Sequence, residues 1–267
     1  MVTGNPVHLI NLHNMEWAIQ PETLESFSDV FINYLNTGES IPKMESSPTG
    51  ICLERLKAGV FCLHIEGTLV PRAFGIDAMC GLIGMNQITE ALHEMYNDRE
   101  IETLVIKVNS GGGTITGTEE LANAIAKAPF NTVAFIDELC ASAAYWIASS
   151  ADKVVCTPSS LIGSIGVYSS RIEKTKDESS QYKRTFFQAG AKKLWGSKDT
   201  VMSHEERTDT QNRVDNLYER FTGYVAKQRK TSQDLVKQTE AGVYYAFNAP
   251  EWMYDYLMDY SDFMEQL

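Results

Sequence analysis

From Gly59 onward, short apolar runs alternate with stretches whose apolar residues are spaced as in a helix, and this alternation most constrains the fold. Strands that alternate with helices pair in parallel, because each helix returns the chain across the sheet. The sequence therefore predicts an α/β domain with a parallel sheet and crossover helices. The expected strands cover residues 60–65, 104–108, 132–136 and 154–156, and the expected helices cover residues 87–96, 118–128 and 143–149.

The segments on either side of this region are less regular. Residues 21–36 carry apolar side chains at helical spacing and acidic residues near their start, which predicts an amphipathic helix. Residues 37–50 contain Gly, Ser and two prolines with almost no apolar residue, so we interpret them as a linker. Further on, Ser203 and Glu206 form a capping box that begins a long helix to about residue 230. The tail from 244 to 267 is expected to hold helix and loop.

Composition excludes several classes of function. The chain has 267 residues, a net charge of −12 and a pI near 4.9, which opposes non-specific binding to nucleic acid or to anionic lipid. Its five cysteines show no metal-binding spacing, which fits a reducing compartment and predicts neither a metal nor a cofactor. We find no run of about 18 apolar residues and no signal peptide at the start. The sequence thus predicts a soluble cytoplasmic protein without a membrane anchor.

A triple glycine follows the second expected strand, in the segment Asn-Ser-Gly-Gly-Gly-Thr at residues 109–114. Glycines leave backbone N–H groups accessible, and such groups bind either a phosphate or the oxyanion of a tetrahedral intermediate. The segment lacks the lysine of a phosphate-binding loop, which disfavours phosphate. A tight turn without chemistry stays an alternative.

Ser142 stands between small residues, after the third expected strand and before a helix. Small neighbours would let a substrate backbone approach its hydroxyl, although a serine at a helix start is more often only an N-cap. Cys140 should pack in the interior. A Ser-His-Asp triad stays open, but no histidine carries a motif, and His64 is expected to be a structural residue within a strand. The other histidines are scattered: His8, His13, His93 and His204.

Four blocks occur together and in order. They are residues 108–113 (VNSGGG), 141–149 (ASAAYWIAS, followed by Ala-Asp-Lys at 151–153 and Pro158), 161–167 (LIGSIGV) and 189–193 (AGAKK). Together they resemble the signal peptide peptidase A family of serine proteases, which act through a Ser-Lys dyad and include phage capsid-assembly proteases. The resemblance covers residues 59 to 259. It implies a Clp protease/crotonase-like fold of repeated β-β-α units, with an N-terminal helical extension and linker at 1–58 and a peptidase domain at 59–267.

The resemblance also implies the site. Ser142 would be the nucleophile, Lys193 the general base and Ser164 the hydroxyl that orients the lysine amine. The oxyanion hole would use backbone N–H groups, and the candidates are Gly113, Ala143 and Gly112. A lysine has a pKa of about 10.4 in water, so the fold must lower it to about 7–8, at a cost of roughly 4 kcal/mol, before the amine can act as a base.

The pattern departs from the family at three places. Lys192 replaces a histidine before the base, which leaves Lys192 as an alternative base. Gly111 replaces a proline in the oxyanion loop, which removes no required N–H group. Near the end, residues 256–259 read Tyr-Leu-Met-Asp where the family often has Gly-Leu-Val-Asp, so the match is weaker there.

Residues 17–22 (WAIQPE) resemble a stretch near the start of phage head proteases. This similarity predicts a capsid-assembly protease that processes scaffold, portal or coat proteins, in the host cytoplasm or inside the immature head. A ring homo-oligomer is expected, in which neighbouring subunits complete the sites, and the linker at 37–50 is a candidate self-processing segment. The alternatives are a soluble cellular signal-peptide or general peptide peptidase, a catalytically silent head-assembly protein, and a crotonase-type acyl-CoA enzyme that would not need Lys193.

Overall fold

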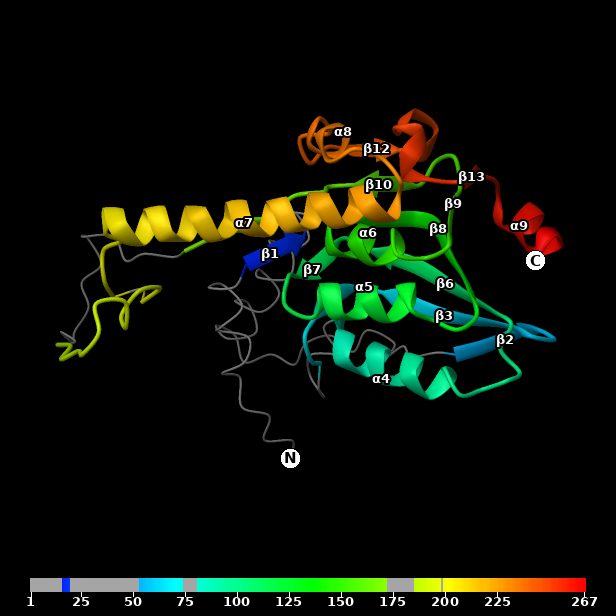
Figure 1. Ribbon diagram of the computed structural model, residues 1–267, viewed down its shortest axis with the longest axis horizontal. Helices are drawn as coiled ribbons and strands as arrows, with labels where there is room; N and C mark the ends of the chain where they lie inside the picture. Colours follow the sequence, from blue (N-terminus) through cyan, green and yellow to red (C-terminus); the bar gives the residue numbers. More distant parts are fainter. Residues whose placement is uncertain (1–15, 20–52, 74–80, 172–184, 198) are drawn as a thin grey trace, which may run out of the picture.

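The computed structural model describes residues 16–19, 53–73, 81–171, 185–197 and 199–267 (Figure 1). The helix predicted at 21–36 and the linker predicted at 37–50 lie outside these residues. The described chain forms two sheets with helices packed against them. None of its described helices has the length and apolar character that crossing a membrane requires.

The larger sheet has a parallel centre, as the alternation of strands and helices predicts. Its path runs β12-β10-β8-β6-β3-β2, and only the two edge strands are antiparallel to their neighbours. The central strands are rich in valine and isoleucine and largely buried, as expected for strands covered on both faces. The strands are β2 (Leu53–Lys57), β3 (Val60–Glu66), β6 (Thr103–Ser110), β8 (Asn131–Ala141), β9 (Lys153–Cys156), β10 (Leu161–Gly163), β12 (Val243–Tyr245) and β13 (Tyr256–Leu257), of which β9 pairs with β8 and β13 with β9.

The smaller sheet runs β11-β1-β7-β4-β5. Its strands are β1 (Glu16–Ile19), β4 (Thr68–Val70), β5 (Leu82–Gly84), β7 (Gly112–Thr114) and β11 (Tyr168–Ser169). The chain passes repeatedly from a strand of the larger sheet to a strand of the smaller one and then into a helix, as in β3–β4–β5–α4 and β6–β7–α5. The predicted α/β fold of repeated β-β-α units is confirmed. β1 and β2 precede residue 59, where we expected the domain to begin, and pair in these sheets.

Three helices pack side by side on the larger sheet: α4 (Met85–Met95), α5 (Thr118–Ala126) and α6 (Ala143–Ala148) (Figure 1). Each lies within two residues of its predicted start. All six residues of α6 are buried, so this short helix forms the centre of the main core. Because α6 is fixed on all sides, the residue that precedes it, Ser142, is held in a rigid frame.

The predicted long helix is α7 (His204–Gln228), and its predicted cap is present: the Ser203 hydroxyl accepts the N–H of Glu206 at 3.0 Å. Its second half packs on α6, where Phe221 stacks on Trp146 with ring centroids 4.4 Å apart. Its first half extends away from the sheets (Figure 1), and apart from the buried Glu206 its side chains are exposed or half-buried.

The tail contains more regular structure than the helix and loop that we predicted. After α8 (Gln233–Lys237) come β12, the 3-10 turns η2 (Ala246–Asn248) and η3 (Glu251–Met253), β13 and α9 (Tyr260–Gln266). Asp255 anchors this tail, because its carboxylate accepts the Val154 N–H at 2.8 Å and pairs with Arg229 at 3.0 Å. Burial alone would raise the pKa of Asp255, but these interactions outweigh it and hold the pKa below its usual value.

Candidate active site

Ser142 follows the last residue of β8 directly, at the carboxyl end of a parallel strand. Its backbone has φ 58° and ψ −121°, a combination that non-glycine residues rarely adopt, and the residue is 1% exposed. Its N–H donates to the Gly163 carbonyl at 2.8 Å, and its own carbonyl accepts the Trp146 N–H at 2.9 Å. Strained backbone of this kind persists only where the surroundings enforce it, and it is concentrated at functional sites.

Ser164 lies next to Ser142 because β10 is parallel to β8 with Gly163 opposite Ala141. Ser142 follows Ala141 and Ser164 follows Gly163, so the two serines are neighbours just beyond two paired strands. Ser164 also has positive φ, at 54°, and its N–H is fixed by the Gly242 carbonyl at 2.8 Å. The structure thus places the predicted nucleophile and Ser164 in neighbouring positions of the backbone.

The glycine loop reaches the same place. Gly112 has φ 102°, and a Cβ on it would stand 3.0 Å from the Ser142 Cβ, so only a glycine permits this approach. A Cβ on Gly113 would stand 1.8 Å from the Leu69 carbonyl oxygen. The Gly112 N–H is 3.2 Å from the Ser110 hydroxyl oxygen. Of the predicted oxyanion residues, Gly112 therefore adjoins Ser142, and Ala143 follows it as the first residue of α6, whereas Gly113 packs against Leu69.

Lys193 is not part of this cluster within one chain. It lies in a turn of residues 191–196, with an exposed side chain that makes no hydrogen bond or ion pair to any residue that the structure describes. Figure 1 shows this yellow segment at the outer end of α7, away from α6. Lys192 instead turns back onto α7, where its Nζ pairs with Asp209 at 2.5 Å and lies 4.6 Å from the centre of the Trp195 ring.

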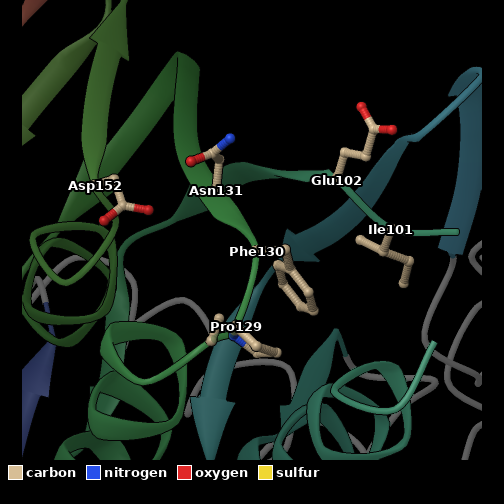
Figure 2. A pocket seen from close by; sticks show the side chains of 7 residues that line it. Ile101, Glu102, Pro129, Phe130, Asn131 and Asp152 are labelled. Atoms are coloured by element: carbon tan, nitrogen blue, oxygen red, sulfur yellow. The ribbon is translucent and has the colours of Figure 1, made fainter. Parts of the chain in front are cut away.

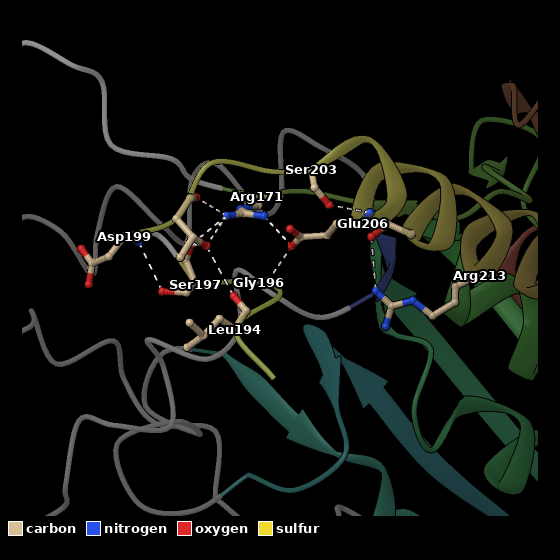
Figure 3. A network of polar contacts seen from close by, with 10 residues as sticks. Arg171, Leu194, Gly196, Ser197, Asp199, Ser203, Glu206 and Arg213 are labelled. Atoms are coloured by element: carbon tan, nitrogen blue, oxygen red, sulfur yellow. Dashed lines mark hydrogen bonds and ion pairs between the residues drawn. The ribbon is translucent and has the colours of Figure 1, made fainter. Parts of the chain in front are cut away.

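A buried ion pair that the sequence did not reveal holds the lysine turn in place. Arg171 donates from one nitrogen to Glu206 at 2.5 Å and from another to the Ser197 carbonyl at 2.7 Å and to the Thr200 carbonyl (Figure 3). The Glu206 carboxylate also accepts the Gly196 N–H at 2.7 Å. Ser203 and Glu206 predicted the start of the helix. The Glu206 side chain, however, forms its ion pair with Arg171, which lies 35 positions earlier in the sequence.

A surface hollow lies at the opposite ends of the central strands of the larger sheet. It has a volume of about 420 Å³ and is lined by Ile101, Glu102, Phe130, Asn131 and Asp152, among others (Figure 2). These residues lie at the amino ends of β6, β8 and β9, whereas Ser142 follows a carboxyl end. The Asp152 carboxylate already accepts two hydrogen bonds, from the N–H and the hydroxyl of Thr132. The hollow is therefore separate from the candidate active site.

The competing nucleophile and bases do not fit the site. Cys140 is fully buried, and its burial and then nearby Cys156 raise the pKa of its thiol well above the usual value, so it stays protonated and packs as predicted. His64 lies between Glu54 and Glu66 at 3.6 and 3.4 Å, which confirms a structural role. Of the histidines that the structure describes, none is hydrogen-bonded to Ser142, and His8 and His13 lie outside the described residues.

Comparison with known proteins identifies the family to which the chain is similar. Residues 124–262 match Peptidase family S49. The chain is 29% identical over 193 residues to the head-tail preconnector protein GP5 of Enterobacteria phage P21, covering 71% of this chain and 38% of that protein. It is 27% identical over 194 residues to the capsid assembly protease C of Escherichia phage lambda, covering 70% and 43%.

A cellular relative is also similar: the putative signal peptide peptidase SppA of Enterococcus faecium is 32% identical over 168 residues, covering 59% of this chain and 47% of that protein. The chain thus spans less than half the length of each of these relatives. Among solved structures, a ClpP1 variant from Listeria monocytogenes superposes with a TM-score of 0.47 at 12% identity, covering 67% of this chain and 86% of that one.

Proposed function

Because the chain belongs to Peptidase family S49, we propose that it is a serine endopeptidase with Ser142 as nucleophile. The observation that carries this proposal is that Ser142, Ser164 and Gly112 lie close together. They follow the carboxyl ends of the neighbouring strands β8, β10 and β6. The Ser142 hydroxyl attacks the substrate carbonyl. Backbone N–H groups of the glycine loop and Ala143 stabilise the oxyanion that forms, which is usually the largest single contribution to such a reaction.

We propose that Lys193 is the general base and that it reaches Ser142 of a neighbouring subunit. Three features of one chain support this arrangement: the lysine lies away from its own Ser142, its amine is exposed, and its segment carries apolar side chains in solvent. Phe187 is 97% exposed and Val201 is 82% exposed. Large apolar side chains on an exposed segment mark an interaction surface. Docking in a second subunit would bury them and would desolvate the lysine amine, as a base requires.

Lys193 suits this role better than Lys192. The Lys192 amine is bound by Asp209 of the same chain and covered by Trp195, whereas the Lys193 amine points into solvent from the same turn. The fixed Lys192 would help to hold the turn, and Lys193 would be the lysine that a partner receives.

The substrate class that we propose is phage head proteins, meaning scaffold, portal or coat proteins processed during capsid assembly. The relatives from phages P21 and lambda support it, and the second of these is named a capsid assembly protease. The SppA relative favours a second candidate, a cellular signal-peptide or general peptide peptidase. Co-expression with head proteins encoded beside this gene separates the two, because only a capsid-assembly protease should cut them at defined positions.

The test of the catalytic proposal compares Ser142→Ala, Lys193→Met and Lys192→Met in casein hydrolysis and in labelling by a fluorophosphonate. Residues that act as a unit lose nearly all activity when either is removed, so the first two changes should each lower turnover by about 10³-fold or more. Lys192→Met, the matched control, should retain most of it. Full casein hydrolysis by Lys193→Met would contradict the dyad and indicate that another group is the base. Absence of turnover and labelling in the unchanged protein would favour a silent assembly protein.

A further inference from the structure

β1 lies between β7 and β11 in the smaller sheet, and Figure 1 shows it beside β7. It pairs antiparallel with β7, with Ala18 opposite Gly113 and Ile19 opposite Gly112. Its other edge pairs antiparallel with β11, with Trp17 opposite Tyr168. The four residues of β1 therefore fill the space of a single strand between β11 and β7, and β7 is part of the glycine loop.

The backbone of β1 passes close to the proposed nucleophile. A Cβ on Gly112 would stand 2.2 Å from the Ala18 carbonyl oxygen and 3.0 Å from the Ser142 Cβ, so a single point lies in contact with both. Trp17, Ala18 and Ile19 are 1%, 0% and 3% exposed. The strand thus closes this side of Ser142 to solvent and leaves no free edge on β7 beside the glycine loop.

A peptide substrate needs this position. Extended peptides bind commonly by adding a strand to an open sheet edge, where main-chain hydrogen bonds supply affinity. A carbonyl that Ser142 is to attack must also lie beside the serine and the oxyanion N–H groups. We infer that β1 is a built-in substrate-like strand that occupies the peptide-binding groove, and that it must leave before a substrate can bind. This inference rests on the proposed peptidase function.

Glu16, the first residue of β1, makes two polar contacts with described residues. Glu16 pairs with Arg213 of α7 at 3.2 Å, and its carbonyl accepts the Ile115 N–H at 3.3 Å. Arg213, at the edge of the view in Figure 3, also lies 3.8 Å from Asp209, the partner of Lys192. A chain of charged contacts thus links β1 to the lysine turn through Arg213 and Asp209. Because of this link, docking of the turn in another subunit would affect how firmly β1 is held.

The first test loosens β1 in the full-length protein. When only a fraction of molecules has an open groove, the apparent affinity for substrate falls by that fraction, so changes that release β1 should raise kcat/KM. Glu16→Ala should raise it about threefold, and Trp17→Ala, which removes a buried anchor, by about tenfold or more. The matched control is Glu100→Ala, which removes an exposed ion pair with Arg55 and should leave kcat/KM unchanged.

The second test supplies the strand from outside. A synthetic peptide of residues 13–22 (HNMEWAIQPE) should inhibit the Trp17→Ala protein competitively, raising KM without changing kcat. The same peptide with proline at the position of Ala18 loses a main-chain N–H and should inhibit at least about tenfold more weakly.

The outcomes separate the two proposals. If the unchanged protein cuts casein and Ser142 is labelled, but neither loosening β1 nor adding the peptide changes kcat/KM, the inference about β1 is wrong and the peptidase stands. If no variant shows turnover or labelling, the peptidase proposal fails, and the inference about β1 fails with it.

Discussion

At the scale of single residues, the site depends on backbone conformations that few residues adopt. Ser142 and Ser164 both have positive φ, and each is fixed by a hydrogen bond from its N–H to a carbonyl of a neighbouring segment. The strain at these two positions is sustained by α6 and β10, which are buried around them. The two hydroxyl groups are thereby placed before any substrate arrives, so little ordering remains to be done during the reaction.

Replacing Ser164 with alanine tests whether its hydroxyl orients the base. Alanine keeps the size and the backbone cost of serine at this φ, so thermal stability should change by less than about 0.5 kcal/mol. The turnover number should fall about 10- to 100-fold while KM changes little, because the hydroxyl acts on the base rather than on substrate binding. Steady-state kinetics on a peptide substrate measure this, and an unchanged kcat would exclude the role.

At the scale of elements, the turn that carries Lys193 depends on Arg171. The side chains of Arg171 and Glu206 are 8% and 5% exposed, although the surrounding segment is largely open to solvent. A buried ion pair is costly to break from one side, because the remaining charge stays without its partner, at about 3–5 kcal/mol. The pair therefore fixes Gly196, Ser197 and Thr200 onto the start of α7.

We expect Arg171→Met to release this turn. Amide hydrogen exchange at Gly196 and Thr200 should accelerate by about 100-fold or more, and kcat should fall in parallel, while the core amides of β6 are unaffected. Arg220→Met breaks the pair between Arg220 of α7 and Glu119 of α5 and serves as the control, with little change expected in either quantity. Unchanged exchange at Gly196 would show that Arg171 does not hold the turn.

The tail is predicted to loosen at low pH through Asp255. Its folded-state pKa is lowered, so the stabilisation it gives is complete above its unfolded pKa of about 3.9 and is lost as the pH falls through the lower folded value. Asp255→Asn should lower the free energy of unfolding by about 2 kcal/mol at pH 7, and the difference should shrink below about pH 4. Denaturant titrations from pH 7 to pH 3 measure it, and a difference that grows toward low pH would reverse the assignment.

The sequence predicts the frame of the fold well because its buried elements carry strong periodic patterns. The central strands and the helices α4 to α7 begin within about two residues of their expected positions. It does not predict β1, β12 or β13, since strands of two to four residues are created by their partners rather than by a local pattern. The role of Arg171 cannot be predicted from the sequence either, because only the tertiary fold brings its partner Glu206 next to it.

For the site, the local motifs predict which residue types take part but not whether those residues meet within one chain or between two. Ser142, Ser164 and Gly112 adjoin in one chain because parallel strands align their carboxyl ends. Lys193 follows no such strand, so the spacing of motifs along the sequence cannot indicate whether it meets Ser142 of its own chain or of another.

At the scale of the whole molecule, one chain holds both members of the proposed catalytic pair but keeps them apart. The lysine turn lies at the outer end of α7, and exposed apolar side chains are found there and at β12 and η2, where Tyr245 and Phe247 stack and are 52% and 55% exposed. These surfaces support assembly into a closed ring, in which each subunit presents Lys193 to the next. Catalysis would then depend on protein concentration, and a subunit outside the ring would be inactive.

Mixing two inactive variants tests this account most directly. Ser142→Ala subunits retain the lysine and Lys193→Met subunits retain the serine, so a site between subunits is restored wherever the two meet in the right order. After the two proteins are unfolded and refolded together in equal amounts, we predict about a quarter of the activity of the unchanged protein, since a random ring restores about one site in four. A mixture as inactive as each variant alone would contradict the pairing of Ser142 with Lys193 across subunits.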